Sequence, residues 1–223
     1  MSAVAEAVLE LPAAGEDLRL GGANALAEYY LGHRISVDLD FFAMEAGRVE
    51  AVGHELTDRL PANGVVASVR PIRTFADFHR FALQPAGGGD ELVVDLGRWM
   101  PPQVASPVVV EGVRVEAFME LAVGKLLALI DRGEAKDVLD LWTICVQGGV
   151  SLEGLVDLAF VKDPGLEEAP FAIADRLSQI GRKLPLPLPS SLMPIDPNEI
   201  QRWFGDQAMG VWRRIRPERR EST

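Results

Sequence analysis

The sequence predicts an α+β fold, in which a mixed β-sheet is followed by a helical C-terminal half. Two observations support this prediction. Short runs rich in β-branched residues, bounded by turns that contain glycine or proline, recur up to residue 115. From residue 116 onward, apolar residues recur at spacings of three and four, which is typical of helices. We therefore expect one domain over residues 1–115 and a helical domain over residues 116–223.

Proline, glycine and alternation signals define the elements of the first half. Pro61 ends a helix, and both the loop 85–90 and the pair Glu111-Gly112 have the composition of hairpin turns. We predict helices over 4–11, 24–31 and 48–60, and strands over 18–20, 35–41, 65–69, 75–83, 91–96, 108–110 and 113–115.

Helical spacing dominates the second half. Ser151 is a candidate N-cap, and Asp196 followed by Pro197 has the pattern of a helix start. The prolines between residues 183 and 189 predict an extended segment, because proline interrupts a helix. We predict helices over 116–130, 135–146, 152–161 and 168–180, and a last helix that begins at residue 196.

Composition limits the class of protein. The chain has 223 residues, of which 48% are hydrophobic and 25% charged, as is ordinary for a globular protein. It contains no apolar run of bilayer length and no basic segment at the N-terminus, so we expect a cytoplasmic protein without membrane contact. The single cysteine, Cys145, excludes an internal disulfide and fits a buried structural thiol.

The charge distribution is uneven. A net charge of −11 argues against a general nucleic-acid coat protein, because phosphates are bound chiefly by clustered lysine and arginine. The last eleven residues are nevertheless rich in arginine, at positions 213, 214, 216, 219 and 220. A solvated tail is the favoured interpretation, and an arm for RNA or an acidic partner is the alternative.

Two carboxylates follow a glycine turn. In the predicted strand 35–41, alternation places Ser36, Asp38 and Asp40 on one face. Aspartates two positions apart can converge on a divalent ion. Upstream, Gly21-Gly22 lies between a strand and a helix, where backbone N–H groups can cradle phosphate. Each half is common alone, whereas their combination indicates a metal and nucleoside triphosphate (NTP) site.

Charged residues within apolar surroundings extend this hypothesis. Asp95 lies in an apolar strand, where it is either a third metal ligand or an edge residue facing water. Lys125 lies on an apolar helical stripe, from which it either snorkels or reaches phosphate oxygens. Asp137 and Asp140 share a helix face, with Lys136 able to pair with Asp140; alone, this pattern indicates only an ordinary acidic helix start.

Together these motifs resemble the AbiEii/AbiGii toxin family of nucleotidyltransferases, within the DNA polymerase β-like superfamily. The resemblance covers about residues 18–142. The matching residues are Leu20-Gly21-Gly22-x-x-Ala25-Leu26, Gly32-His33-Arg34-x-Ser36-x-Asp38-Leu39-Asp40-x-Phe42, Val94-Asp95, Lys125-Leu126-x-Ala128-Leu129-x-x-Arg132 and Lys136-Asp137-x-x-Asp140-Leu141.

The resemblance implies a mixed-sheet nucleotidyltransferase core and a helical C-terminal half. It implies Mg²⁺ or Mn²⁺ held by Asp38, Asp40 and Asp95, and a further active-site carboxylate at Asp137 or Asp140. It places the triphosphate near Gly21, Gly22, Arg34, Ser36 and Lys125. Family members act as toxins of bacterial toxin–antitoxin or phage-defence pairs, and some modify tRNA 3′ ends. A cognate antitoxin and a tRNA acceptor are therefore expected partners.

One position departs from the family pattern. Ala23 stands where relatives usually carry threonine or serine, and Asn24 is a candidate to replace the missing hydroxyl as a nucleotide ligand. Two alternatives therefore stay open. One is a small-molecule nucleotidyltransferase of the kind that modifies antibiotics, and the other is a non-catalytic member that binds a nucleotide or a partner.

Overall fold

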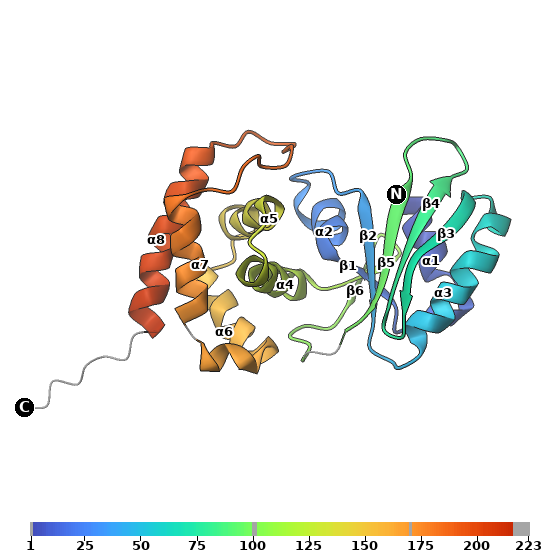
Figure 1. Cartoon of the computed structure of the whole chain (residues 1–223), viewed down its shortest axis with the longest axis horizontal. Coiled ribbons are helices and arrows are strands. Elements are labelled where there is room, and N and C mark those ends of the chain that lie inside the picture. Colours follow the sequence, from blue (N-terminus) through green and yellow to red (C-terminus); the bar gives the residue numbers. More distant parts are fainter. Residues whose placement is uncertain (1, 100–101, 170, 216–223) are drawn as a thin grey trace, which may run out of the picture. The chain divides into compact units, whose positions relative to one another are not determined.

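A seven-stranded mixed β-sheet organises the first half of the chain in the computed structural model, which describes residues 2–99, 102–169 and 171–215 (Figure 1). The chain divides into two compact units, of which one ends at Leu121 and the other begins at Ala122. Helices dominate the second unit, as predicted. No helix within the described ranges is long and apolar enough to cross a membrane.

The strand order of the sheet is β3-β4-β5-β2-β1-β7-β6, and the pairs β2/β5 and β1/β7 are parallel while the others are antiparallel. This confirms the predicted mixed sheet. The elements of this unit are α1 (Ser2–Leu9), η1 (Pro12–Ala14), β1 (Arg19–Gly21), α2 (Gly22–Leu26), η2 (Ala27–Leu31), β2 (Asp38–Ala43), α3 (Arg48–Arg59), η3 (Pro61–Asn63), β3 (Val66–Phe75), β4 (Phe78–Pro85), β5 (Leu92–Arg98), β6 (Val108–Val110) and β7 (Val113–Val115).

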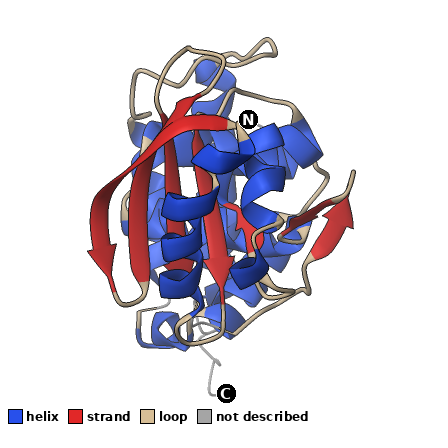
Figure 2. Ribbon diagram, turned by 90° about the vertical axis from the view of Figure 1, so that its right-hand side faces the viewer, coloured by secondary structure: helices blue, strands red, loops and turns tan. Residues whose placement is uncertain are grey.

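The two faces of the sheet have opposite character. One face carries fully buried apolar side chains such as Leu39, Phe41 and Leu96, and α3 packs against it, as the view from the α3 side shows (Figure 2). Gly53 of α3 leaves room for His79 of β4, because a Cβ there would lie 2.4 Å from the histidine Nδ1. The opposite face carries Asp38 and Asp40 of β2, Arg80 of β4 and Asp95 of β5. Because successive side chains of a strand point to opposite faces, the apolar residues face the core and the charged residues face the candidate site.

The segment before β2 differs from the prediction. α2 and η2 form one helical stretch whose last five residues are π-helical, and it ends at Gly32 in the left-handed conformation. β2 begins only at Asp38, and Ile35 and Val37 are 63% and 62% exposed. The prediction that a strand starts at residue 35, with Ser36 on its polar face, is therefore wrong. Residues 33–37 are needed to connect the end of the helix to the strand.

The second unit is a helical assembly. Its elements are the greater part of α4 (Phe118–Asp131), then α5 (Ala135–Val146), α6 (Leu152–Lys162), η4 (Pro164–Glu168), α7 (Phe171–Arg182) and α8 (Pro197–Ile215). Ser151 caps α6 by accepting a hydrogen bond from the N–H of Gly154 at 3.1 Å, as predicted. α7 and α8 pack closely, because a Cβ on Gly181 would lie 2.7 Å from the Gly205 backbone.

The arginine-rich end of the chain is described only in part. Arg213 and Arg214 lie in the last turn of α8, and Arg214 binds the carboxylate of Asp157 on α6 at 2.5 and 2.6 Å. Arg216, Arg219 and Arg220 lie outside the described residues.

Candidate active site

Three carboxylates lie on the charged face of the sheet. Asp40 of β2 is the cross-strand partner of Asp95 on β5, and Asp38 lies two residues before Asp40 on the same face. Asp38 is exposed, while Asp40 and Asp95 are half-buried. The parallel pairing of β2 with β5 thus brings together residues that are far apart in the sequence.

The glycine turn lies directly against Asp40. β1 pairs with β2 so that Gly21 is opposite Asp40, and Gly22 has a φ of +64°. A Cβ on Gly22 would lie 2.0 Å from Oδ2 of Asp40, and one on Gly21 would lie 2.6 Å from Oε2 of Glu116. Only glycine allows this approach of backbone to carboxylate, and α2 begins at Gly22, where the first N–H groups of a helix have no acceptor within the helix itself.

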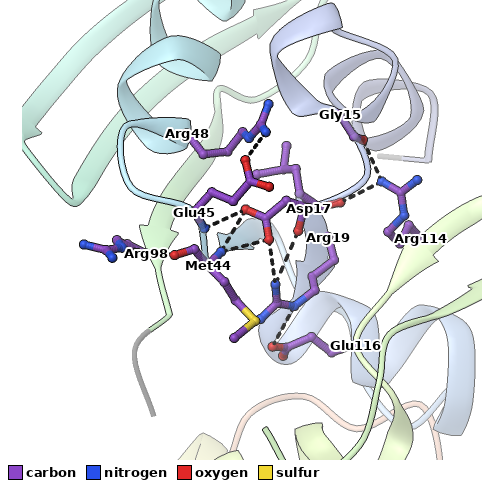
Figure 3. Close-up of polar contacts among 10 residues, drawn as sticks. Gly15, Asp17, Arg19, Met44, Glu45, Arg48, Arg98, Arg114 and Glu116 are labelled. Atoms are coloured by element: carbon purple, nitrogen blue, oxygen red, sulfur yellow. Dashed lines mark hydrogen bonds and ion pairs between the residues drawn. The ribbon is translucent and has the colours of Figure 1, made fainter. Parts of the chain in front are cut away.

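A buried arginine anchors β1 just before the glycine turn (Figure 3). The side chain of Arg19 is 2% exposed and lies 3.9 Å from the Asp17 carboxylate and 3.7 Å from that of Glu116. Asp17 also accepts hydrogen bonds from the N–H of Met44 after β2, at 2.9 and 3.1 Å. Tyr30 donates to the carbonyl of Glu116 at 2.8 Å, and burial, reinforced by the Glu116 charge, raises the pKa of Tyr30.

The polar residues predicted as nucleotide ligands around the turn are interior. Asn24, Arg34 and Ser36 are all buried. Asn24 Nδ2 donates to the carbonyl of Ser36 at 3.3 Å, which ties residues 33–37 to α2. Arg34 donates to the carbonyl of Ile35 at 3.2 Å. These contacts shape the turn, and contact of the three side chains with a nucleotide stays a prediction.

Asp95 is bound by an arginine that the sequence did not single out. Nε and Nη2 of Arg80, on β4, bind the two oxygens of Asp95 at 2.7 and 2.5 Å. This hydrogen bonding, together with the charges of Asp95, Asp38 and Asp40, raises the pKa of Arg80. The guanidinium therefore places a positive charge directly on Asp95 and within the electrostatic influence of Asp38 and Asp40. In the sequence, Arg80 lies between His79 and Phe81, and this local pattern does not indicate a pairing with Asp95.

The donor set suits a hard cation in part. The carboxylates of Asp38, which is exposed, and Asp40, which is half-buried, lie on one face, and carboxylate oxygens are the donors that Mg²⁺ prefers. Both oxygens of Asp95 are engaged by Arg80. Within residues 2–99, 102–169 and 171–215, no group of three or more His, Cys, Asp or Glu side chains is arranged to hold a metal. Asp38 and Asp40 are thus the candidate metal ligands, and Asp95 is held by Arg80.

The remaining predicted site residues form a buried ion-pair network in the second unit. Lys125 Nζ lies 2.8 Å from Asp140 Oδ2 and 3.9 Å from Asp137 Oδ1, and Arg132 binds both oxygens of Asp137 at 2.7 Å. Both aspartates are fully buried, so Lys125 is an ion-pair partner in the interior rather than a snorkelling surface residue. The predicted pairing of Lys136 with Asp140 is wrong, because Lys136 binds Glu134 at 3.0 Å at the exposed start of α5.

The family model for the nucleotidyl transferase AbiEii toxin of type IV toxin–antitoxin systems matches residues 4–190. The chain belongs to the AbiEii family. The match includes the glycine turn, the β2 aspartates, Asp95 and the Lys125 network. A comparison with curated proteins gave no match.

Solved structures similar to this AbiEii-family chain share its fold. JHP933 from Helicobacter pylori is 20% identical with a TM-score of 0.55, and the alignment covers 96% of this chain and 89% of that one. A putative nucleotidyltransferase from H. pylori is 20% identical, with a TM-score of 0.57 and coverages of 96% and 92%. MenT4, a nucleotidyltransferase toxin from Mycobacterium tuberculosis, is 15% identical, with a TM-score of 0.56 and coverages of 96% and 83%.

Proposed function

We propose that this chain is a metal-dependent toxin that transfers a nucleotide from an NTP to the 3′ end of a tRNA. Its AbiEii membership supports nucleotide transfer and a toxin role. The observation that carries the finer proposal is the position of Asp40, which lies between a glycine turn suited to phosphate and a second carboxylate on β5. A cognate antitoxin is the expected protein partner.

In this proposal Asp38 and Asp40 hold Mg²⁺ or Mn²⁺, which neutralises phosphate charge and lowers the pKa of the attacking hydroxyl when bound. The N–H groups that begin at Gly22 hold phosphate oxygens of the NTP. The acceptor oxygen forms a bond to the α-phosphorus, the bond to the β-phosphate oxygen breaks, and pyrophosphate leaves. Asp95 lies beside Asp40 on the same face of the sheet, and the proton of the acceptor hydroxyl passes to solvent. Arg80 orients Asp95 through its two hydrogen bonds.

A transfer assay tests the proposal. The chain is incubated with each α-labelled NTP, with Mg²⁺ or Mn²⁺, and with total tRNA or a panel of aminoglycosides. We expect label on tRNA that requires the metal and falls at least about a hundredfold in Asp38→Asn. Asp58→Asn is the matched control, because Asp58 is an exposed carboxylate on α3, which packs on the opposite face of the sheet.

Other outcomes discriminate between the alternatives. Label on an aminoglycoside but not on tRNA would contradict tRNA as the acceptor and favour a small-molecule acceptor, while nucleotide transfer from the NTP would still be supported. Nucleotide binding without transfer to either acceptor would contradict the enzymatic proposal and favour a binding protein.

A further inference from the structure

The charged face of the sheet continues beyond the three carboxylates onto β4 and β3. The strand register places Arg73, Arg80, Asp95, Asp40 and Gly21 in one row across five strands. Neighbouring strands lie about 4.8 Å apart, so the Arg73 backbone is about 10 Å from that of Asp95. A polymer bound over β3 and β4 can therefore deliver its end to the carboxylates.

The hairpin of β3 and β4 has a composition that is unusual in this acidic chain. Its two strands carry three arginines, Arg70, Arg73 and Arg80, and no aspartate or glutamate, although the whole chain has a net charge of −11. Arg70, Arg73 and Arg80 all lie on the charged face, since their cross-strand partners do. Cationic residues are thus gathered beside the site that would receive a phosphodiester chain.

Two aromatic rings lie on the same face of the hairpin. Phe75 and Phe78 are cross-strand partners, Phe75 is 63% exposed, and the Arg80 guanidinium lies 5.9 Å from the Phe78 ring centroid. An exposed ring at a strand end contributes nothing to the core. An exposed aromatic ring beside arginines is instead an arrangement that binds single-stranded nucleic acid, with a base stacked on the ring and phosphates paired with the cations.

The arginines differ in their availability. Arg70 binds Glu91 at 2.9 and 3.0 Å, and Arg80 binds Asp95. Arg73 is exposed and has no ion pair with any residue in the described part of the chain. Arg73 is therefore the cation that can bind a phosphate without first giving up a carboxylate.

The outer edge of β3 is less suited to a protein strand. Pro71 has no N–H to donate, and the register shifts between Pro71 and Arg73, which interrupts a regular ladder. Nucleic acid therefore fits the face of this hairpin better than an added strand fits its edge.

We propose that the face of the β3–β4 hairpin binds the single-stranded 3′ end of the RNA acceptor, with Phe75 stacking on a base and Arg73 binding phosphate. The proposal rests on the proposed function, since it assigns the surface that presents the acceptor hydroxyl to Asp40 and Asp95. It makes Arg73 and Phe75 determinants of acceptor affinity rather than catalytic residues.

The test compares Phe75→Ala and Arg73→Glu with the control variant Arg59→Glu. Arg59 has a side chain that is 57% exposed and lies on α3, which packs on the opposite face of the sheet. Kd for fluorescein-labelled total tRNA is measured by anisotropy over a salt series, and kcat and KM for tRNA are measured at saturating NTP. We expect Phe75→Ala to raise Kd and KM about tenfold with kcat kept. Arg73→Glu should weaken binding and lower the salt slope by about one, and Arg73→Lys should restore both.

The outcomes separate this inference from the proposed function. Both hairpin variants are first shown to be folded by thermal melting. If they transfer to tRNA with unchanged Kd and KM, the hairpin is not the RNA-binding surface, and the proposed function is unaffected. A wild-type chain that neither binds tRNA nor transfers to it would overturn both. Unaltered tRNA binding together with loss of binding to the cognate antitoxin would make the hairpin a protein surface and overturn the proposal.

Discussion

Replacing Gly22 with alanine is expected to lower the free energy of unfolding by about 2–5 kcal/mol. Gly22 has a φ of +64°, and a side chain in the left-handed region costs about 1–2 kcal/mol. The added Cβ would also lie 2.0 Å from Oδ2 of Asp40, and such overpacking costs about 1–3 kcal/mol. Relief of the clash requires the Asp40 carboxylate to move, so nucleotide transfer should be lost even where the variant is folded.

Gly64→Ala is the matched control for this prediction. Gly64 has a φ of +71° and nothing within 4 Å of the position of an added Cβ. Gly64→Ala should therefore lower the free energy of unfolding only by the cost of the left-handed backbone conformation, about 1–2 kcal/mol. Urea denaturation compares the two variants, and the transfer assay is run at a temperature where both are folded. Equal losses of stability with full transfer in Gly22→Ala would refute the close approach of the turn to Asp40.

Three further predictions concern buried titratable groups. Lys125→Met removes the 2.8 Å ion pair with the fully buried Asp140 and should lower the free energy of unfolding, measured by urea denaturation, by about 3–5 kcal/mol. A decrease of less than about 1 kcal/mol would contradict a stabilising role for this ion pair. Burial raises the pKa of Cys145 to about 12, so iodoacetamide at pH 8 should alkylate the native thiol more than about a hundredfold slower than the unfolded one; equal rates would contradict this. Burial lowers the pKa of His79, so the unfolded state binds the proton more tightly than the folded state. The free energy of unfolding should therefore fall as the pH drops below about 6.5, and it should fall less in His79→Gln. Identical pH profiles for wild type and His79→Gln would contradict the lowered pKa of His79.

Local patterns predicted most elements but not the contacts between them. The hairpin turn at Glu111-Gly112 and the Ser151 cap follow from a few neighbouring residues, and both are present. The period-two pattern failed at Ile35 and Val37, because the connection from a π-helical turn leaves these apolar residues exposed. Periodicity cannot distinguish an apolar loop residue from a strand residue when both fit the alternation.

In the candidate site, too, local patterns predicted individual residues but not the contacts between strands. The aspartates of β2 were apparent from the sequence, because alternation places Asp38 and Asp40 on one strand face after a glycine turn. The Arg80–Asp95 pair was not, because it depends on the register between β4 and β5. Arg19 was missed for a similar reason, since its anionic neighbours Asp17 and Glu116 come from separate parts of the chain.

Metal-dependent nucleotide binding at Asp38 and Asp40 is the central claim. It is tested most directly by calorimetric titration of a non-hydrolysable NTP analogue with Mn²⁺ or with EDTA, into wild type, Asp38→Asn, Asp40→Asn and the control Asp58→Asn. We predict binding that requires Mn²⁺ and weakens at least about tenfold in Asp38→Asn and Asp40→Asn, but not in Asp58→Asn. Equal binding in EDTA and in all four proteins would contradict a metal site at the two aspartates.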